Sequence, residues 1–141
     1  MKRIGLLLGV SLAVGISVGV IGTHILNAQQ ELAKGTVLQR AELAGIKGKE
    51  AVLVLREIPP GAASGKHYQS GNEVVYILEG SAILEVEGKT PVTLKAGDTF
   101  QTGPRQVHNV KNASTTAPAR ALVFYVVAKG KSLSDFSTPA K

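Results

Sequence analysis

The sequence has no cysteine and no tryptophan, and only 4% of its 141 residues are aromatic. Without cysteine the chain has no disulfide framework, no thiolate ligand for a metal and no cysteine nucleophile. A lipoprotein-type lipid anchor is excluded for the same reason, because it needs a cysteine thiol. The scarcity of aromatic rings argues against a stacking platform for single-stranded nucleic acid. These absences exclude thiol chemistry and disfavour nucleic-acid binding.

The length and composition indicate one folded domain. Hydrophobic residues make up 44% of the chain, which is enough for a packed core, and 141 residues match a single domain of ordinary size. The net charge is +6, but Lys2 and Arg3 at the N-terminus supply two of these charges. The other basic residues are scattered and form no stripe, so we expect a solvated surface and no nucleic-acid partner.

Residues 1–28 resemble a bacterial export signal, with a basic start, an uncharged apolar stretch at residues 4–22 and the small Ala28 before a candidate cut. The apolar stretch is longer than the ~7–15 residues of a typical signal and close to the ~20 that cross a bilayer. We therefore expect either a cleaved signal peptide or an N-terminal membrane anchor. The rest of the protein is then periplasmic or extracytoplasmic, soluble or held at the inner membrane through residues 4–22 alone.

The remainder of the chain is predicted to form a barrel of short strands at residues 36–132, after a linker at 29–35 and before a flexible tail at 133–141. Runs rich in β-branched residues recur every ~8–12 residues and are separated by Gly and Pro, which is typical of an all-β sandwich or barrel. No stretch after residue 49 has the apolar spacing of a helix. About eight strands are expected, at residues 36–40, 50–58, 73–79, 82–87, 91–94, 99–101, 106–111 and 120–128.

Two histidines and one glutamate are the candidates for chemistry. His67 and Gln69 are two residues apart, so in an extended chain they project to the same face, and a turn at 70–72 returns Glu73 to that face. His108 lies on a later predicted strand. Two imidazoles and one carboxylate match the donor set that leaves open positions on non-haem Fe(II). The alternative is that all three are ordinary polar residues in a barrel mouth.

The spacing of these residues resembles the two motifs of the cupin superfamily, and in particular small exported bacterial cupins of type 2. The first motif is matched by Gly61-x5-His67-x-Gln69-x3-Glu73-x6-Gly80. The second is matched by Gly97-x10-His108-x3-Asn112. The chain departs from the family at Gln69, where a second histidine is usual, and at Gly103-Pro104-Arg105, where Pro-x-Gly is usual. The resemblance covers roughly residues 36–132.

The resemblance implies a double-stranded β-helix, the jelly-roll barrel, here preceded by an N-terminal apolar helix. It also implies a divalent metal inside the barrel, held by His67, Gln69, Glu73 and His108. Iron, manganese, nickel, zinc and copper are not distinguished, and no other cofactor is expected. Gln69 could ligate the metal, hold a metal-bound water or turn away, because a neutral amide carbonyl is a weaker donor than imidazole.

Two classes of function remain open at this point. One is an exported metal-dependent dioxygenase acting on a small molecule, with Glu73 as a candidate general base; an isomerase is the lesser enzyme alternative. The other is a non-catalytic module of the cell envelope that binds a small ligand. A homodimer is expected in either case. At Arg105, either a turn with positive φ strains the arginine or Pro104 resets the turn, and the side chain would meet an anionic substrate if it lies over the mouth.

Overall fold

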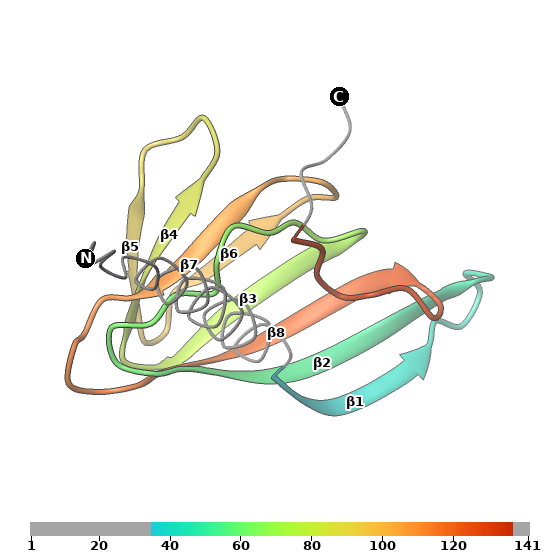
Figure 1. Cartoon of the computed structure of the whole chain (residues 1–141). Helices are drawn as coiled ribbons and strands as arrows, with labels where there is room; N and C mark the ends of the chain where they lie inside the picture. The colour runs from blue at the N-terminus through green and yellow to red at the C-terminus, as the bar shows by residue number, and fades with distance from the viewer. Residues whose placement is uncertain (1–34, 137–141) are drawn as a thin grey trace, which may run out of the picture.

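The computed structural model describes residues 35–136, which fold into two antiparallel β-sheets that pack face to face (Figure 1). The expected export segment at 1–28 and its apolar helix fall outside this range. Within the described range no helix is long and apolar enough to cross a membrane. The prediction that the body of the chain is all-β is confirmed for these residues.

The two sheets contain eight strands. These are β1 (Thr36–Glu42), β2 (Lys49–Ile58), β3 (Asn72–Glu79), β4 (Ser81–Val86), β5 (Val92–Lys95), β6 (Thr99–Thr102), β7 (His108–Asn112) and β8 (Ala119–Ala128). One sheet has the order β1-β2-β8-β3-β6 and the other has the order β5-β4-β7. Each predicted strand is present, and its ends differ from the prediction by one or two residues.

The core lies between the sheets and follows from the alternation along each strand. On β2, β3 and β8 every second side chain is buried, because successive side chains of a strand point to opposite faces. The buried apolar cluster consists of Val52, Val54, Val75, Ile77, Ala82, Leu84, Leu94, Ala121, Val123, Tyr125 and Val127. Tyr125 is fully buried in it and carries the only polar side-chain group of this cluster. The inner face of the larger sheet is therefore largely apolar, and its buried polar residues outside the candidate site include Glu50, which pairs with Arg40.

The segment between β2 and β3 joins the two sheets. Pro59 and Pro60 end β2, as the sequence predicts, because proline cannot donate to a strand ladder. Residues 61–70 then leave the larger sheet and run antiparallel to β7 of the smaller one, with a bridge between Ala63 and Lys111 and another between His67 and His108. This crossing brings the first motif of the sequence against the second.

The segment at the C-terminal end of the described range is attached to the domain. The backbone groups of Tyr68 and Asp135 exchange two hydrogen bonds of 2.8 and 2.9 Å, and the Tyr68 hydroxyl donates to the Asp135 carboxylate. The ring of Phe136 lies 5.5 Å from the ring of His67. Of the tail expected to be flexible at 133–141, the described residues 133–136 are thus held against the segment that carries His67.

Candidate functional site

His67 and His108 are placed side by side by the crossing segment. The backbone NH of each donates to the carbonyl oxygen of the other, both at 2.9 Å. Directly opposed residues of an antiparallel pair carry their side chains on the same face. The two rings are accordingly 4.4 Å apart between centroids, and both are buried. The predicted convergence of these histidines is present, although His67 lies in a bridging segment and not in a named strand.

Backbone carbonyls set the tautomer of both rings. Nδ1 of His67 is 2.8 Å from the carbonyl oxygen of Gly65, and Nδ1 of His108 is 2.9 Å from that of Gln106. A carbonyl oxygen can only accept, so Nδ1 carries the hydrogen and Nε2 of a neutral ring has a free lone pair. Burial, followed by the charge of the neighbouring His108, lowers the pKa of His67 to about 4. His67 is therefore neutral at neutral pH.

Glu73 lies in a row of polar side chains across the inner face of the larger sheet. It is opposite Thr102 on β6 and opposite Tyr125 on β8. The Thr102 hydroxyl donates to Oε2 of Glu73 at 2.7 Å. Burial alone would raise the pKa of Glu73, but the proximity of His108, 3.2 Å away, together with the hydrogen bond from Thr102, holds this pKa below its usual value. The carboxylate is therefore ionised although it is buried.

His108 and Glu73 are in close contact, but no hydrogen bond joins them. Nε2 of His108 is 3.2 Å from Oε2 of Glu73, but it makes no hydrogen bond of acceptable geometry. In the neutral tautomer described above, both atoms are acceptors and repel each other. This repulsion is removed only if the imidazole carries a second proton or if a cation binds between the two atoms. Two donors at about 2.1 Å from one ion, at a right angle, lie about 3 Å apart, so the observed spacing suits a shared metal.

Gln69 is the third unusual group. Its side chain is fully buried, yet neither its amide nitrogen nor its amide oxygen has a hydrogen-bond partner. A buried amide without a partner costs about 1–3 kcal/mol, and such groups are rare in folded proteins. The side chain of the intervening Tyr68 points elsewhere, to Asp135, as strand parity predicts. The unpartnered amide makes Gln69 a candidate ligand-binding residue.

These donors suit a divalent metal in chemistry and burial, but the structure does not display a complete metal site. Among residues 35–136, no group of three or more His, Cys, Asp or Glu side chains is arranged to hold an ion. Glu73 and His108 are in contact, and the ring of His67 lies tilted beside that of His108 without completing the set. The ligand assignment to His67, Gln69, Glu73 and His108 thus stays a prediction.

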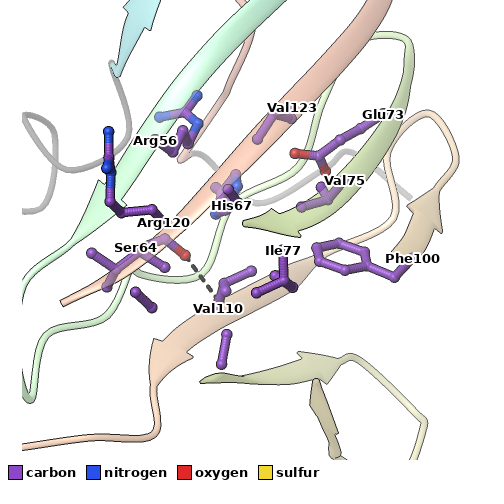
Figure 2. A pocket seen from close by; sticks show the side chains of 14 residues that line it. Arg56, Ser64, His67, Glu73, Val75, Ile77, Phe100, Val110, Arg120 and Val123 are labelled. Carbon is purple, nitrogen blue, oxygen red and sulfur yellow. Dashed lines mark hydrogen bonds between the residues drawn. The ribbon is translucent and has the colours of Figure 1, made fainter. Parts of the chain in front are cut away.

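A narrow pocket, partly open to solvent, extends from His67 and Glu73 between the two sheets (Figure 2). Its walls are mostly aliphatic, and a few charged and polar side chains are distributed among them. The other residues that line it are Arg56, Ile58, Ser64, Val75, Ile77, Ala82, Phe100, Val110, Ala119, Arg120, Ala121 and Val123. The pocket lies next to the candidate donors.

Sequence reasoning did not find Arg56, the cation on the inner face of the pocket. By strand parity Arg56 points inward with Val54 and Ile58. Its Nε and Nη2 donate to the Tyr125 hydroxyl at 3.2 and 2.9 Å. Arg120, in contrast, stands opposite Glu57 in the ladder and lies 3.8 Å from its carboxylate. The signal for Arg56 was available, since a charge at an inward position of an apolar strand is unusual.

Arg105 has the strained conformation that the sequence analysis considered. Its φ is +63°, the only positive φ of a non-glycine residue in the described range. It follows Pro104 in a turn closed by Gly103 and Gln106, and proline followed by a positive φ is the pattern of a type II turn. Its backbone NH donates to the Gln69 carbonyl at 2.9 Å. The side chain is exposed and does not line the pocket, so the alternative that places it over the mouth gains no support.

We expect Arg105→Gly to stabilise the protein. A left-handed conformation costs about 1–2 kcal/mol for a residue with a Cβ, and the greater freedom of glycine in the unfolded chain offsets part of the gain. The free energy of unfolding should therefore rise by about 0.5–1 kcal/mol, measured by urea denaturation. Arg105→Ala is the matched control, because it removes the same side chain but keeps the strain. Equal stability of the glycine and alanine variants would contradict the explanation.

Comparison with known proteins is consistent with this fold. The family model for the cupin domain matches residues 54–125, whereas no curated protein matches the chain. One similar structure is a double-stranded β-helix protein from Klebsiella pneumoniae, 20% identical, with TM-score 0.51 over 76% of this chain and 94% of that one. Another is a cupin-like protein from Thermotoga maritima, 18% identical, with TM-score 0.56 over 73% and 74% of the two chains. The DMSP lyase DddQ from Ruegeria pomeroyi is 23% identical, with TM-score 0.52 over 68% and 46%.

Proposed function

Because this chain belongs to the cupin family, we propose that its two sheets form the double-stranded β-helix barrel and that this barrel binds one divalent metal ion. His67, Glu73 and His108 would supply the strong donors, and Gln69 would supply an amide oxygen to the ion or to its water. The pocket beside them would hold a small molecule. The protein would act outside the cytoplasm, delivered there by residues 1–28 as a cleaved signal or an anchor.

The observation that supports a metal most directly is the unpartnered His108 Nε2, 3.2 Å from the Glu73 carboxylate. A protonated His108 would explain this contact by itself. It would not explain why the side-chain amide of Gln69 is fully buried with no partner for either polar atom. A cation between the three side chains would satisfy all of them at once. We therefore favour a metal over a proton.

Elemental analysis of the purified protein tests this proposal, followed by calorimetric titration with Mn(II), Fe(II) and Ni(II). One equivalent of metal per chain is expected. A protein that neither retains nor takes up any of these ions would disprove the proposal. The second candidate function, a small-ligand module without metal, would then lead, because the apolar pocket itself does not depend on an ion.

For catalysis we propose oxidation of a small substrate by O2, with isomerisation as the alternative. The metal, when bound, would supply open coordination positions for substrate and O2. Glu73 is ionised and reaches both the pocket and the donor set, so it is the candidate to accept a proton from a bound substrate. Oxygen uptake in a screen of phenolic substrates would support an enzyme. Binding of small molecules without turnover would support the non-catalytic module.

We also propose that the protein is a homodimer that pairs through the outer face of the larger sheet. Apolar side chains on the outer side of β3 and β8 are each between 41% and 45% exposed: Val74, Tyr76, Leu78 and Phe124. An exposed apolar patch of this kind is typical of an interaction site. The edge strand β1 pairs with β2 of its own chain.

Phe124→Lys is expected to convert the dimer to a monomer, because it places a charge in the centre of this patch, opposite Val74. Sedimentation velocity at high micromolar concentration measures the change. Val92→Lys is the matched control, since it also replaces an exposed apolar residue with lysine, but on β5 of the other sheet. A wild-type protein that sediments as a monomer under these conditions would contradict the proposal.

A further inference from the structure

We propose that Thr102 is a positioning residue, whose hydroxyl group fixes the Glu73 carboxylate beside His108 and thereby sets the affinity of the site for metal. This inference rests on the proposed function, because it gives a role toward the proposed metal to a residue that is not itself a ligand. Thr102 lies in the unspecified spacer between Gly97 and His108, so the sequence motifs do not single it out.

The backbone of β6 determines where the Thr102 side chain lies. Thr102 is the last residue of this strand and stands directly opposite Glu73 of β3 in the ladder. The outward side chains of β6, Thr99 and Gln101, are exposed, whereas Thr102 is fully buried on the inner face. A threonine has two heavy atoms on Cβ, which restricts its χ1 angle. The hydroxyl group of Thr102 is therefore held in one place by the strand and by burial.

The hydroxyl group of Thr102 acts on the carboxylate oxygen that faces His108. It donates to Oε2 of Glu73 at 2.7 Å, and both side chains are buried. A hydrogen bond to a carboxylate is stronger than one between neutral groups. The same oxygen, Oε2, lies 3.2 Å from Nε2 of His108. A carboxylate oxygen can accept from more than one direction, so Oε2 can keep the bond from Thr102 while it binds an ion shared with His108.

Both neighbours of Glu73 in the ladder carry a hydroxyl group, but they are engaged differently. The hydroxyl group of Tyr125, on β8, accepts from Nε and Nη2 of Arg56 at 3.2 and 2.9 Å. Removing it would therefore disturb Arg56 as well as the surroundings of Glu73. The Thr102 hydroxyl donates to Glu73 itself, so its removal tests the position of the carboxylate more directly.

A fixed carboxylate favours metal binding for an entropic reason. A carboxylate that rotates freely in the metal-free protein loses that freedom when it ligates an ion, and the loss weakens binding. Groups that orient metal ligands through hydrogen bonds typically change metal affinity by about 10- to 100-fold when they are removed. The Thr102 hydroxyl has the position of such a group, because it restrains the oxygen of Glu73 that lies closest to His108.

Variants of Thr102 that differ in the hydroxyl group test the inference. Thr102→Val keeps the shape of the side chain and removes the hydroxyl group, and Thr102→Ser keeps the hydroxyl group. Thr102→Ala is a second variant without the hydroxyl group, used if valine disturbs the fold, which circular dichroism checks. Thr99→Val is the matched control, because it makes the same change at an exposed position of the same strand.

Three measurements are made on the full chain after removal of metal by dialysis against a chelator. Calorimetric titration with Mn(II) gives the affinity, and the absorption spectrum of the Co(II)-loaded protein reports on the coordination geometry. Crystal structures of the metal-free wild type and of Thr102→Val locate the Glu73 carboxylate.

Thr102→Val and Thr102→Ala are expected to bind Mn(II) about 10- to 100-fold more weakly than the wild type and to change the Co(II) spectrum. Thr102→Ser should retain most of the affinity and the wild-type spectrum, and Thr99→Val all of both. In the metal-free crystals, Glu73 should leave His108 in Thr102→Val but not in the wild type.

Wild-type affinity in the variants without the hydroxyl group, or an equal loss in Thr102→Ser, would overturn the inference and leave the proposed metal in place. A wild-type protein that binds neither Mn(II) nor Co(II) would instead contradict the proposed function. The crystal structures then decide the inference: a displaced Glu73 in Thr102→Val supports the positioning role, and an unchanged Glu73 overturns it.

Discussion

His108→Ala is expected to abolish stoichiometric metal binding, with affinity falling by at least about 100-fold. The proposed set has three strong donors, and two of them cannot offset the dehydration of a divalent ion. His67→Ala should have the same effect, although it leaves the contact between His108 and Glu73 intact. Calorimetric titration with Mn(II), Fe(II) and Ni(II) measures both variants. Wild-type affinity in His108→Ala would show that the site is wrongly assigned.

Variants of Gln69 test whether this residue is a weak ligand of the metal. Gln69→Ala should leave the metal bound about 10-fold more weakly, because a neutral amide contributes less than an imidazole. Gln69→His would complete the donor set usual in the family and should raise affinity for Ni(II), Cu(II) and Zn(II) more than for Mn(II). Gln101→Ala is the control, since this glutamine is exposed on β6. If Gln69→Ala and Gln101→Ala bind metal equally, Gln69 has no role in the site.

Asn112→Ala is expected to destabilise the fold by about 3 kcal/mol. The Asn112 amide nitrogen lies within hydrogen-bond distance of the carbonyl oxygens of Ile58 (2.9 Å), Pro59 (3.2 Å) and Ala117 (2.8 Å), and its amide oxygen accepts from Ser114 NH at 2.8 Å. The side chain is buried where the end of β2 meets the loop before β8. Its removal takes this donor from the buried Ile58 carbonyl and from the partly buried carbonyls of Pro59 and Ala117, at about 1–3 kcal/mol for a buried orphaned group.

Urea denaturation measures the loss, and the melting temperature should fall on the order of 10 °C or more. Asn72→Ala is the matched control, because this asparagine is exposed at the start of β3 and should change stability by less than about 0.5 kcal/mol. Asn112→Asp keeps the acceptor for Ser114 but places a carboxylate against carbonyl oxygens, so it should be no more stable than the alanine variant. A loss below about 1 kcal/mol in Asn112→Ala would contradict this role.

The sequence by itself determined most of the secondary structure and the polarity of each strand. Its β-branched runs and Gly/Pro punctuation predict all eight strands, because burial of one face imposes alternation and proline and glycine end the ladders. Parity also placed His67, Gln69 and Glu73 on the interior, where they are found buried. These features depend on neighbours in sequence, so local rules suffice for them.

The tertiary structure alone decided which of these side chains meet. The bridge between His67 and His108 joins residues 41 positions apart through a segment that crosses between sheets, and no periodicity in the sequence encodes that crossing. The same holds for the contact between Arg56 and Tyr125, which depends on the register of β2 with β8. Register and sheet order are set by the collective burial of both faces, and local propensity does not contain them. The contact between Arg56 and Tyr125 was therefore visible only in the folded chain, although the inward charge itself could have been read from the sequence.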